Sequence, residues 1–119
     1  MTVTRHEITT GPGPRMSRCV VKGDNVYVAG LTASDTSGDI RSQTQQILDK
    51  IDHYLSTAGS DKSKLLQANL WITDMANFAA MNEVWNAWVD AENPPVRACV
   101  RADLARPEIL VEIMVTAYR

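Results

Sequence analysis

The chain has 119 residues, of which 45% are hydrophobic and 22% are charged, and this length suits a single domain with one core over residues 1–119. The formal net charge of −2 excludes the basic surface expected of a nucleic-acid-binding protein, and no apolar run approaches the length of a membrane span. The two cysteines, Cys19 and Cys99, form no disulfide framework, and residues 1–7 lack the apolar stretch of a signal peptide. We therefore expect a reduced, cytoplasmic protein.

The first third of the chain predicts three strands. Residues 2–8 form the first strand, and residues 16–22 and 25–29 form a hairpin with its turn at residues 23–24. Residues 30–39 are polar and rich in turn-forming side chains. A loop of this length in a small domain is more often functional than not.

A helix is expected after this loop. Asp39 is a suitable N-cap, and Gly59 is a suitable stop at the other end. Apolar side chains recur between them at helical spacing and form one stripe. The residues of the stripe are Ile40, Thr44, Ile47, Leu48, Ile51, Tyr54 and Leu55.

The next segment predicts a strand and a second helix. Residues 64–73 form the strand, with alternate side chains expected to face the core: Leu66, Ala68, Leu70 and Ile72. Asp74 is expected to cap the helix, which runs to about Ala91 and carries an apolar stripe of Phe78, Met81, Trp85 and Trp88 or Val89. The prolines at 94–95 end this helix.

Two final strands, over residues 94–101 and 109–117, each place apolar side chains on one face and charge on the other. The side chains expected to face the core are Val96, Ala98 and Val100 on the first strand, and Ile109, Val111, Ile113, Val115 and Ala117 on the second. If these core faces align, Arg97 and Glu112 lie on the same side of the sheet. We expect the chemistry on that side.

The order of elements favours an α+β fold of two layers. Two helices cannot cover both faces of a mixed sheet of five or six strands, so both are expected on one face. The other face would carry Met114, Thr116 and Tyr118 beside Arg97 and Glu112, and it is too apolar to be left in water. Association of copies would cover it.

Several segments together resemble the Rid family, the YjgF/RidA enamine/imine deaminases. The run PVRACV at residues 95–100, followed by VEI at residues 111–113, is similar to the family's C-terminal signature. Further segments agree in order and spacing over nearly the whole chain from Gly13: residues 26–30, Gln43 and Thr44 with Leu48, residues 72–75 and residues 78–85. The resemblance implies a chorismate-mutase-like fold and a homotrimer with a site in each cleft between subunits.

The resemblance also assigns roles to two charged residues. From spacing alone Arg97 reads as a surface arginine or a structural ion pair, whereas the family uses the arginine at this position to clamp a substrate carboxylate. Glu112 sits in the middle of a strand, where an unpartnered carboxylate is costly to bury. It is either an ion-paired interface charge or, as in the family, the carboxylate that positions the attacking water.

The remaining site candidates act through binding. The resemblance places Gly30 and the backbone near Cys99 at the nitrogen end of the substrate, while the Cys99 side chain itself reads as a small apolar group filling an interface. Asn82 shares the apolar stripe of its helix, which indicates either a satisfied core amide bracing a loop or a residue supporting the site. His6 and His53 have no metal-ligand spacing, and neither a metal nor an organic cofactor is expected.

Four residues depart from the family's usual pattern. Met16 stands where archetypal members have Tyr, Ala29 where they have Ser, Leu31 where they have Gln, and Met114 where a second Glu is common. Met16 and Ala29 would still line the substrate site. The loss of polar groups argues against the archetypal substrate, 2-iminopropionate, and indicates a divergent subgroup.

Two cations are additions to the family's pattern. Arg18 stands where Gln is usual, and Arg101 where an acidic residue is usual. The simpler interpretation is that both are solvated or paired with carboxylates across an interface. The alternative is that one of them binds a second acidic group of the substrate. Met16, Ala29 and Leu31 would then leave apolar space for a longer substrate chain.

The functional hypothesis is hydrolytic deamination of reactive enamine/imine intermediates that carry a carboxylate, giving 2-oxo acids and ammonia. One alternative is a non-catalytic trimer that keeps Arg97 as a carboxylate sensor. A second is an endoribonuclease, an activity that has been attached to the family. The acidic balance and the lack of a histidine-based site argue against the ribonuclease.

Overall fold

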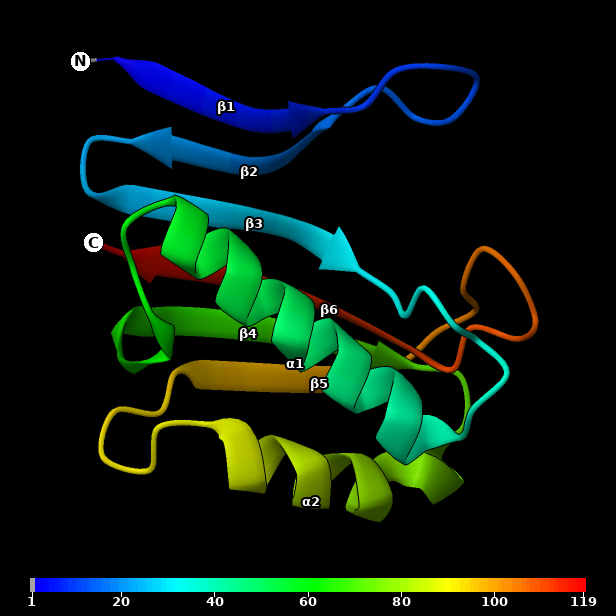
Figure 1. The fold of residues 1–119 in the computed structure, drawn as a ribbon. Coiled ribbons are helices and arrows are strands. Elements are labelled where there is room, and N and C mark those ends of the chain that lie inside the picture. The colour runs from blue at the N-terminus through cyan, green and yellow to red at the C-terminus, as the bar shows by residue number, and fades with distance from the viewer. Residues whose placement is uncertain (1) are drawn as a thin grey trace.

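Six strands and two α-helices follow one another in the predicted order (Figure 1). The computed structural model describes residues 2–119. The elements are β1 Val3–Ile8, β2 Ser17–Lys22, β3 Asn25–Leu31, α1 Ile40–Thr57, β4 Leu65–Ile72, α2 Phe78–Trp88, β5 Val96–Arg101 and β6 Val111–Tyr118, with single 3-10 turns at Lys62–Lys64 and Met75–Asn77. None of the helices in residues 2–119 is long and apolar enough to cross a bilayer.

The strands form one mixed sheet in the order β1-β2-β3-β6-β4-β5. Only β4 and β5 pair in parallel, because α2 connects them, and every other neighbouring pair is antiparallel. Figure 1 shows α1 and α2 on the same face of this sheet, with the other face bare. The predicted α+β fold with two layers is confirmed.

The core lies between α1 and the covered face of the sheet. The predicted stripe of α1 is buried, as are the alternate residues of β6 from Val111 to Ala117. Fully buried side chains of this kind contribute about 1.5–3 kcal/mol each. The largest are Ile47, Leu48, Ile51, Leu55, Leu70, Ile72, Met81 and Ile113.

The ends of α1 follow the predicted capping chemistry. The carboxylate of Asp39 accepts a hydrogen bond from the backbone N–H of Ser42 at 3.0 Å. At the other end Gly59 has a φ of 81°, which is the left-handed conformation that glycine adopts without strain. Helix α1 is therefore closed at both ends by local interactions.

Helix α2 differs from its prediction at both ends. Asp74 caps the preceding 3-10 turn, where it accepts from the N–H of Ala76 at 2.9 Å, and α2 itself begins at Phe78. The helix ends at Trp88 rather than Ala91, because the carboxylate of Asp90 binds the backbone of the following turn instead.

One residue of β4 faces away from the core, contrary to expectation. Leu66 is 47% exposed, whereas Leu65 is buried. The pairing of β4 with β6 shifts between Leu65 and Gln67, and this irregularity changes which residue of the pair points inward.

Strand β5 presents the opposite face from the one predicted. It pairs in parallel with β4, so that Arg97 lies beside Ala68, a fully buried residue of the helix-covered face. Val96 is 70% exposed and Val100 is 50% exposed, so they point to the bare face. The prediction that Val96, Ala98 and Val100 face the core is wrong, because β5 is an edge strand whose apolar face lies on the uncovered side.

The bare face of the sheet is apolar, as expected. Five of its large side chains are more than a third exposed. They lie on the three strands β3, β5 and β6: Tyr27, Val96, Val100, Met114 and Tyr118. Exposed apolar side chains gathered on one sheet face are typical of an interaction surface.

Gln43 connects the loop before α1 to the segment before β6. Its Nε2 donates to the carbonyls of Thr36, Gly38 and Glu108 at 3.0–3.3 Å, and its Oε1 accepts from the N–H of Leu110 at 2.9 Å. The side chain is completely buried. We expect Gln43→Ala to lower the free energy of unfolding by about 3 kcal/mol, because it leaves buried backbone groups without partners.

Gln45 provides the matched control for this prediction. It lies on the exposed side of α1 and bonds only to Asp49, so Gln45→Ala should change the free energy of unfolding by less than about 0.5 kcal/mol. Denaturant titration of both variants measures the difference. Equal stabilities would contradict the role assigned to Gln43.

Candidate functional site

The first group of predicted site residues lies where β3 approaches β6. The pairing of these strands shifts between Val28 and Leu31, which places a bulge at Ala29 and Gly30. A Cβ added at Gly30 would lie 2.3 Å from Oε2 of Glu112. Only glycine therefore allows the Glu112 side chain to lie against the β3 backbone at this position, and bulges of this kind are common beside functional sites.

The Glu112 carboxylate has no hydrogen-bond or ion-pair partner among residues 2–119. Its side chain is half-buried on the bare face of the sheet. No arginine of residues 2–119 forms an ion pair with Glu112. The alternative of an ion pair across an interface between copies stays a prediction. A carboxylate placed this way is free to bind a ligand or a water molecule.

Met16 lies at the same end of the sheet, just before β2. Its backbone is held by Thr9, which donates its N–H to the Met16 carbonyl at 2.8 Å and accepts from the Met16 N–H at 2.9 Å. Met16 and Arg18 line a cavity of about 570 Å³ beside β1. We name Met16, Ala29, Gly30 and Glu112 the Glu112 group.

The second group surrounds Arg97 on β5. Its guanidinium carbon lies 5.5 Å from the ring centre of Trp85 and 5.9 Å from that of Phe78, both on α2. Such contacts hold a guanidinium in place without neutralising it. Arg97 makes no ion pair within residues 2–119, so its forked donors are free for a ligand.

Cys99 follows Arg97 on the same face of β5, beside the buried Leu70 of β4. Burial raises the pKa of the Cys99 thiol above its ordinary value, although the positive charge of Arg97 acts in the opposite direction. The thiol is therefore neutral near pH 7, which argues against a thiolate nucleophile.

Asn82 lies on α2 between Phe78 and Trp85, on the helix face that these aromatic residues share. Its Oδ1 is buried and has no hydrogen-bond partner among residues 2–119. The interpretation of Asn82 as a satisfied core amide is therefore wrong. A buried acceptor without a partner is rare in folded proteins. Arg97, Cys99 and Asn82 form the Arg97 group.

The two groups lie on opposite faces of the sheet. Arg97 is the neighbour of Ala68 on β4, and Glu112 is the neighbour of Trp71, three residues further along the same strand. Side chains three apart on a strand point to opposite faces. The prediction that Arg97 and Glu112 share a side is wrong, because the alternation of β5 shows which residues share a face but not which face is covered.

The separation of the groups within one chain is also large. Two strand spacings and three residues of strand put the Arg97 and Glu112 Cα atoms about 14 Å apart. One small substrate cannot contact both side chains of the same chain. A site that uses both must combine the Arg97 group of one copy with the Glu112 group of another.

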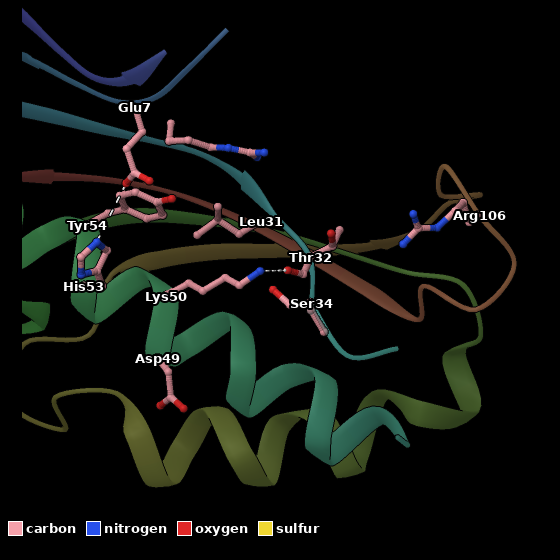
Figure 2. Close-up of a pocket in the computed structure, with 11 residues that line it drawn as sticks. Glu7, Leu31, Thr32, Ser34, Asp49, Lys50, His53, Tyr54 and Arg106 are labelled. Carbon is pink, nitrogen blue, oxygen red and sulfur yellow. Dashed lines mark hydrogen bonds and ion pairs between the residues drawn. The ribbon is translucent and has the colours of Figure 1, made fainter. Parts of the chain in front are cut away.

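A cavity on the helix-covered side of the sheet was not predicted from the sequence. It has a volume of about 650 Å³ and lies between α1 and the first three strands (Figure 2). Arg18, which the sequence analysis singled out, lines it together with Lys50 of α1. The sequence offers little reason to place Lys50 in a cavity, because a single lysine on an amphipathic helix is usually solvated.

Comparison with known proteins shows the family of this chain. The family model described as Endoribonuclease L-PSP matches residues 10–119. The chain belongs to this family, the Rid/YjgF proteins. A RutC family protein from Haemophilus ducreyi is 39% identical over 115 residues, which cover 97% of this chain and 95% of the relative.

Solved structures of Rid-family proteins share the fold. The crystal structure of a YjgF-family protein from Neisseria meningitidis superposes with a TM-score of 0.91 at 39% identity, covering 100% of this chain and 96% of the other. A further relative, from Acinetobacter baylyi, is named 3-aminoacrylate deaminase RutC and is 34% identical over 82% of both chains. The Rid family thus includes an enamine deaminase.

Proposed function

We propose that this Rid-family chain hydrolyses carboxylate-bearing enamine/imine intermediates to 2-oxo acids and ammonia. The observation that carries the proposal is the pair of unpartnered charges, Arg97 over its aromatic rings and Glu112 against Gly30. The relative named as a 3-aminoacrylate deaminase supports the same reaction class.

Arg97 binds the substrate carboxylate. A guanidinium fork matches the two carboxylate oxygens, and the rings of Phe78 and Trp85 fix the plane of the fork. Asn82 lies one turn from each ring on the same helix face and supports the site rather than contacting the substrate. Fixed orientation of this kind lowers the barrier by removing the entropy cost of alignment.

Glu112 acts on water. Its carboxylate accepts a proton as the water oxygen attacks the imine carbon, and the C=N π electrons move to nitrogen. The nitrogen takes up the proton that Glu112 removed from the water, which gives a carbinolamine. The hydroxyl proton of the carbinolamine then passes to the nitrogen, the C–N bond breaks with loss of ammonia, and the C=O bond forms. Water and imine thus give 2-oxo acid and ammonia without an external oxidant or a cofactor, because the imine is already electrophilic.

The complete site forms between copies, and the proposed assembly is a homotrimer. The two groups lie on opposite faces within one chain, and the apolar bare face offers the surface for association. Sedimentation should give about three times the chain mass of 13.2 kDa. A stable monomer at micromolar concentration would contradict the two-copy site.

Gly30→Ala tests the contact between β3 and Glu112. The new Cβ would meet Oε2 of Glu112, the far end of a flexible side chain, so the side chain can turn away and the fold survives. We expect deamination to fall about 100-fold, while the free energy of unfolding changes by about 1 kcal/mol or less. Retained activity in Gly30→Ala would show that Glu112 need not lie against Gly30.

One assay tests the function itself. An L-amino-acid oxidase or a threonine dehydratase generates the imine, and its decay is followed with and without this protein. Acceleration that saturates with imine concentration is the expected result. Saturable binding without acceleration would instead support the non-catalytic alternative. The cytoplasmic location and the absence of a cofactor remain predictions.

A further inference from the structure

The cavity beside α1 is lined by two cations that form no ion pair among the described residues, Arg18 and Lys50. Arg18 of β2 makes no hydrogen bond or ion pair through its side chain within residues 2–119. Lys50 of α1 donates one bond, to the Thr32 carbonyl at 2.7 Å, and its other two N–H donors have no partner in the same residues. Two cations therefore line one cavity without an ion pair to a carboxylate of the same residues.

The surroundings of Lys50 make this arrangement costly. Burial lowers the pKa of the Lys50 ammonium below its ordinary value, and the positive charge of Arg18 lowers it further. The cation is thus partly desolvated and repelled by its neighbour. A bound anion would relieve both effects at once.

The carboxylates that line the cavity in the described part of the chain form no ion pair with these two cations. Glu7 lies 3.9 Å from Nε2 of His53, and it also raises the pKa of Tyr54, where burial has the larger effect. Asp49 accepts from Gln45 at 2.9 Å along the outer side of α1, and Figure 2 shows it pointing away from Lys50. Neither forms an ion pair with Arg18 or Lys50.

The rest of the lining suits a small organic anion. Ser34 and Thr32 bring hydroxyl groups to the cavity, and Leu31 and Ala33 bring apolar surface. Figure 2 shows Arg106 on the far side of the cavity from Tyr54. A volume of about 650 Å³ is within the range of small-molecule sites.

We propose that this cavity binds a small-molecule oxyanion, a carboxylate or a phosphate, between the Arg18 guanidinium and the Lys50 ammonium. The site is independent of the proposed deamination. Arg97 of the same chain lies four strands away from Arg18 in the sheet, about 19 Å at ordinary strand spacing. An anion bound here therefore does not occupy the Arg97 of its own chain.

Calorimetric titration tests this site with two anions, inorganic phosphate and glutarate, and with neutral 1,5-pentanediol as the uncharged probe. At least one anion should bind the intact protein, with affinity that falls as salt is added, and the diol should not. Arg18→Gln should weaken that binding about tenfold or more, because one charge-assisted contact is lost. Phosphate binding alone would identify a phosphate site, and glutarate binding alone a carboxylate site.

Arg101→Gln is the matched control, since Arg101 is an exposed cation at the end of β5 and does not line the cavity. Its anion affinity should equal that of the unchanged protein. Arg97→Ala should also retain the affinity, which separates this site from the proposed deaminase. The proposal is overturned if neither anion binds at millimolar concentration, if Arg18→Gln binds normally, or if Arg97→Ala loses as much affinity as Arg18→Gln.

Discussion

Arg97→Ala is expected to reduce deamination about 100- to 1,000-fold, the usual effect of removing one fixed donor to a reacting substrate. The substrate carboxylate loses its two parallel hydrogen bonds, and the imine carbon is no longer aligned with the water. Arg97→Lys should not restore the rate, because a single ammonium cannot reproduce a planar fork. Initial rates of imine decay at several substrate concentrations measure the effect.

The fold should survive this change. Arg97 forms no ion pair within residues 2–119, and its contacts with Trp85 and Phe78 are worth about 1 kcal/mol at a partly exposed site. Arg101→Ala, which removes a cation from the same strand, serves as the control and should leave the rate unchanged. Near-normal deamination by Arg97→Ala would remove the basis for the carboxylate clamp.

Glu112→Gln is expected to lower kcat about 100- to 10,000-fold while KM changes little. The amide keeps the size of the side chain against Gly30 but cannot accept a proton from water. Binding through Arg97 is untouched, so the loss should fall on the chemical step. Steady-state kinetics separate the two parameters.

A different division of the effect between kcat and KM would change the role assigned to Glu112. If KM rises and kcat holds, Glu112 contacts the substrate directly rather than the attacking water. Trp71 is the neighbour of Glu112 on β4, and Trp71→Phe offers a control that perturbs the same face of the sheet without changing charge. This control should retain most of its kcat.

Regular elements with strong periodicity could be predicted from the sequence. Helix α1 carries an apolar stripe between Asp39 and Gly59, and both ends formed as those residues indicate. Strand β6 alternates cleanly from Val111 to Ala117. In both elements the local pattern and the tertiary packing favour the same conformation.

The orientation of β5 could not be predicted in the same way. Alternation groups Arg97 with Cys99, but the covered side depends on where α2 packs and on what lies against the bare face. Apolar Val96 and Val100 suggested a core inside one chain, whereas they belong to an exposed surface. When the apolar face of an edge strand serves for association, its pattern alone wrongly predicts that this face packs against the core of its own chain.

Other features depended on long-range contacts. The irregular pairing that exposes Leu66 arises between β4 and β6. The cavity beside α1 is lined by residues from distant parts of the chain, and Lys50 within it donates to the Thr32 carbonyl, 18 residues earlier. No local pattern marks such a contact, so only the folded structure shows Lys50 beside Arg18.

Co-expression of Arg97→Ala and Glu112→Gln tests the site between copies most directly. Each variant alone should be nearly inactive. In mixed assemblies, about one quarter of the sites should combine an intact Arg97 from one copy with an intact Glu112 from its neighbour, and activity should return to about a quarter of the unchanged protein's value. Mixed assemblies that stay as inactive as the separate variants would place both residues of the site in one chain and contradict the account.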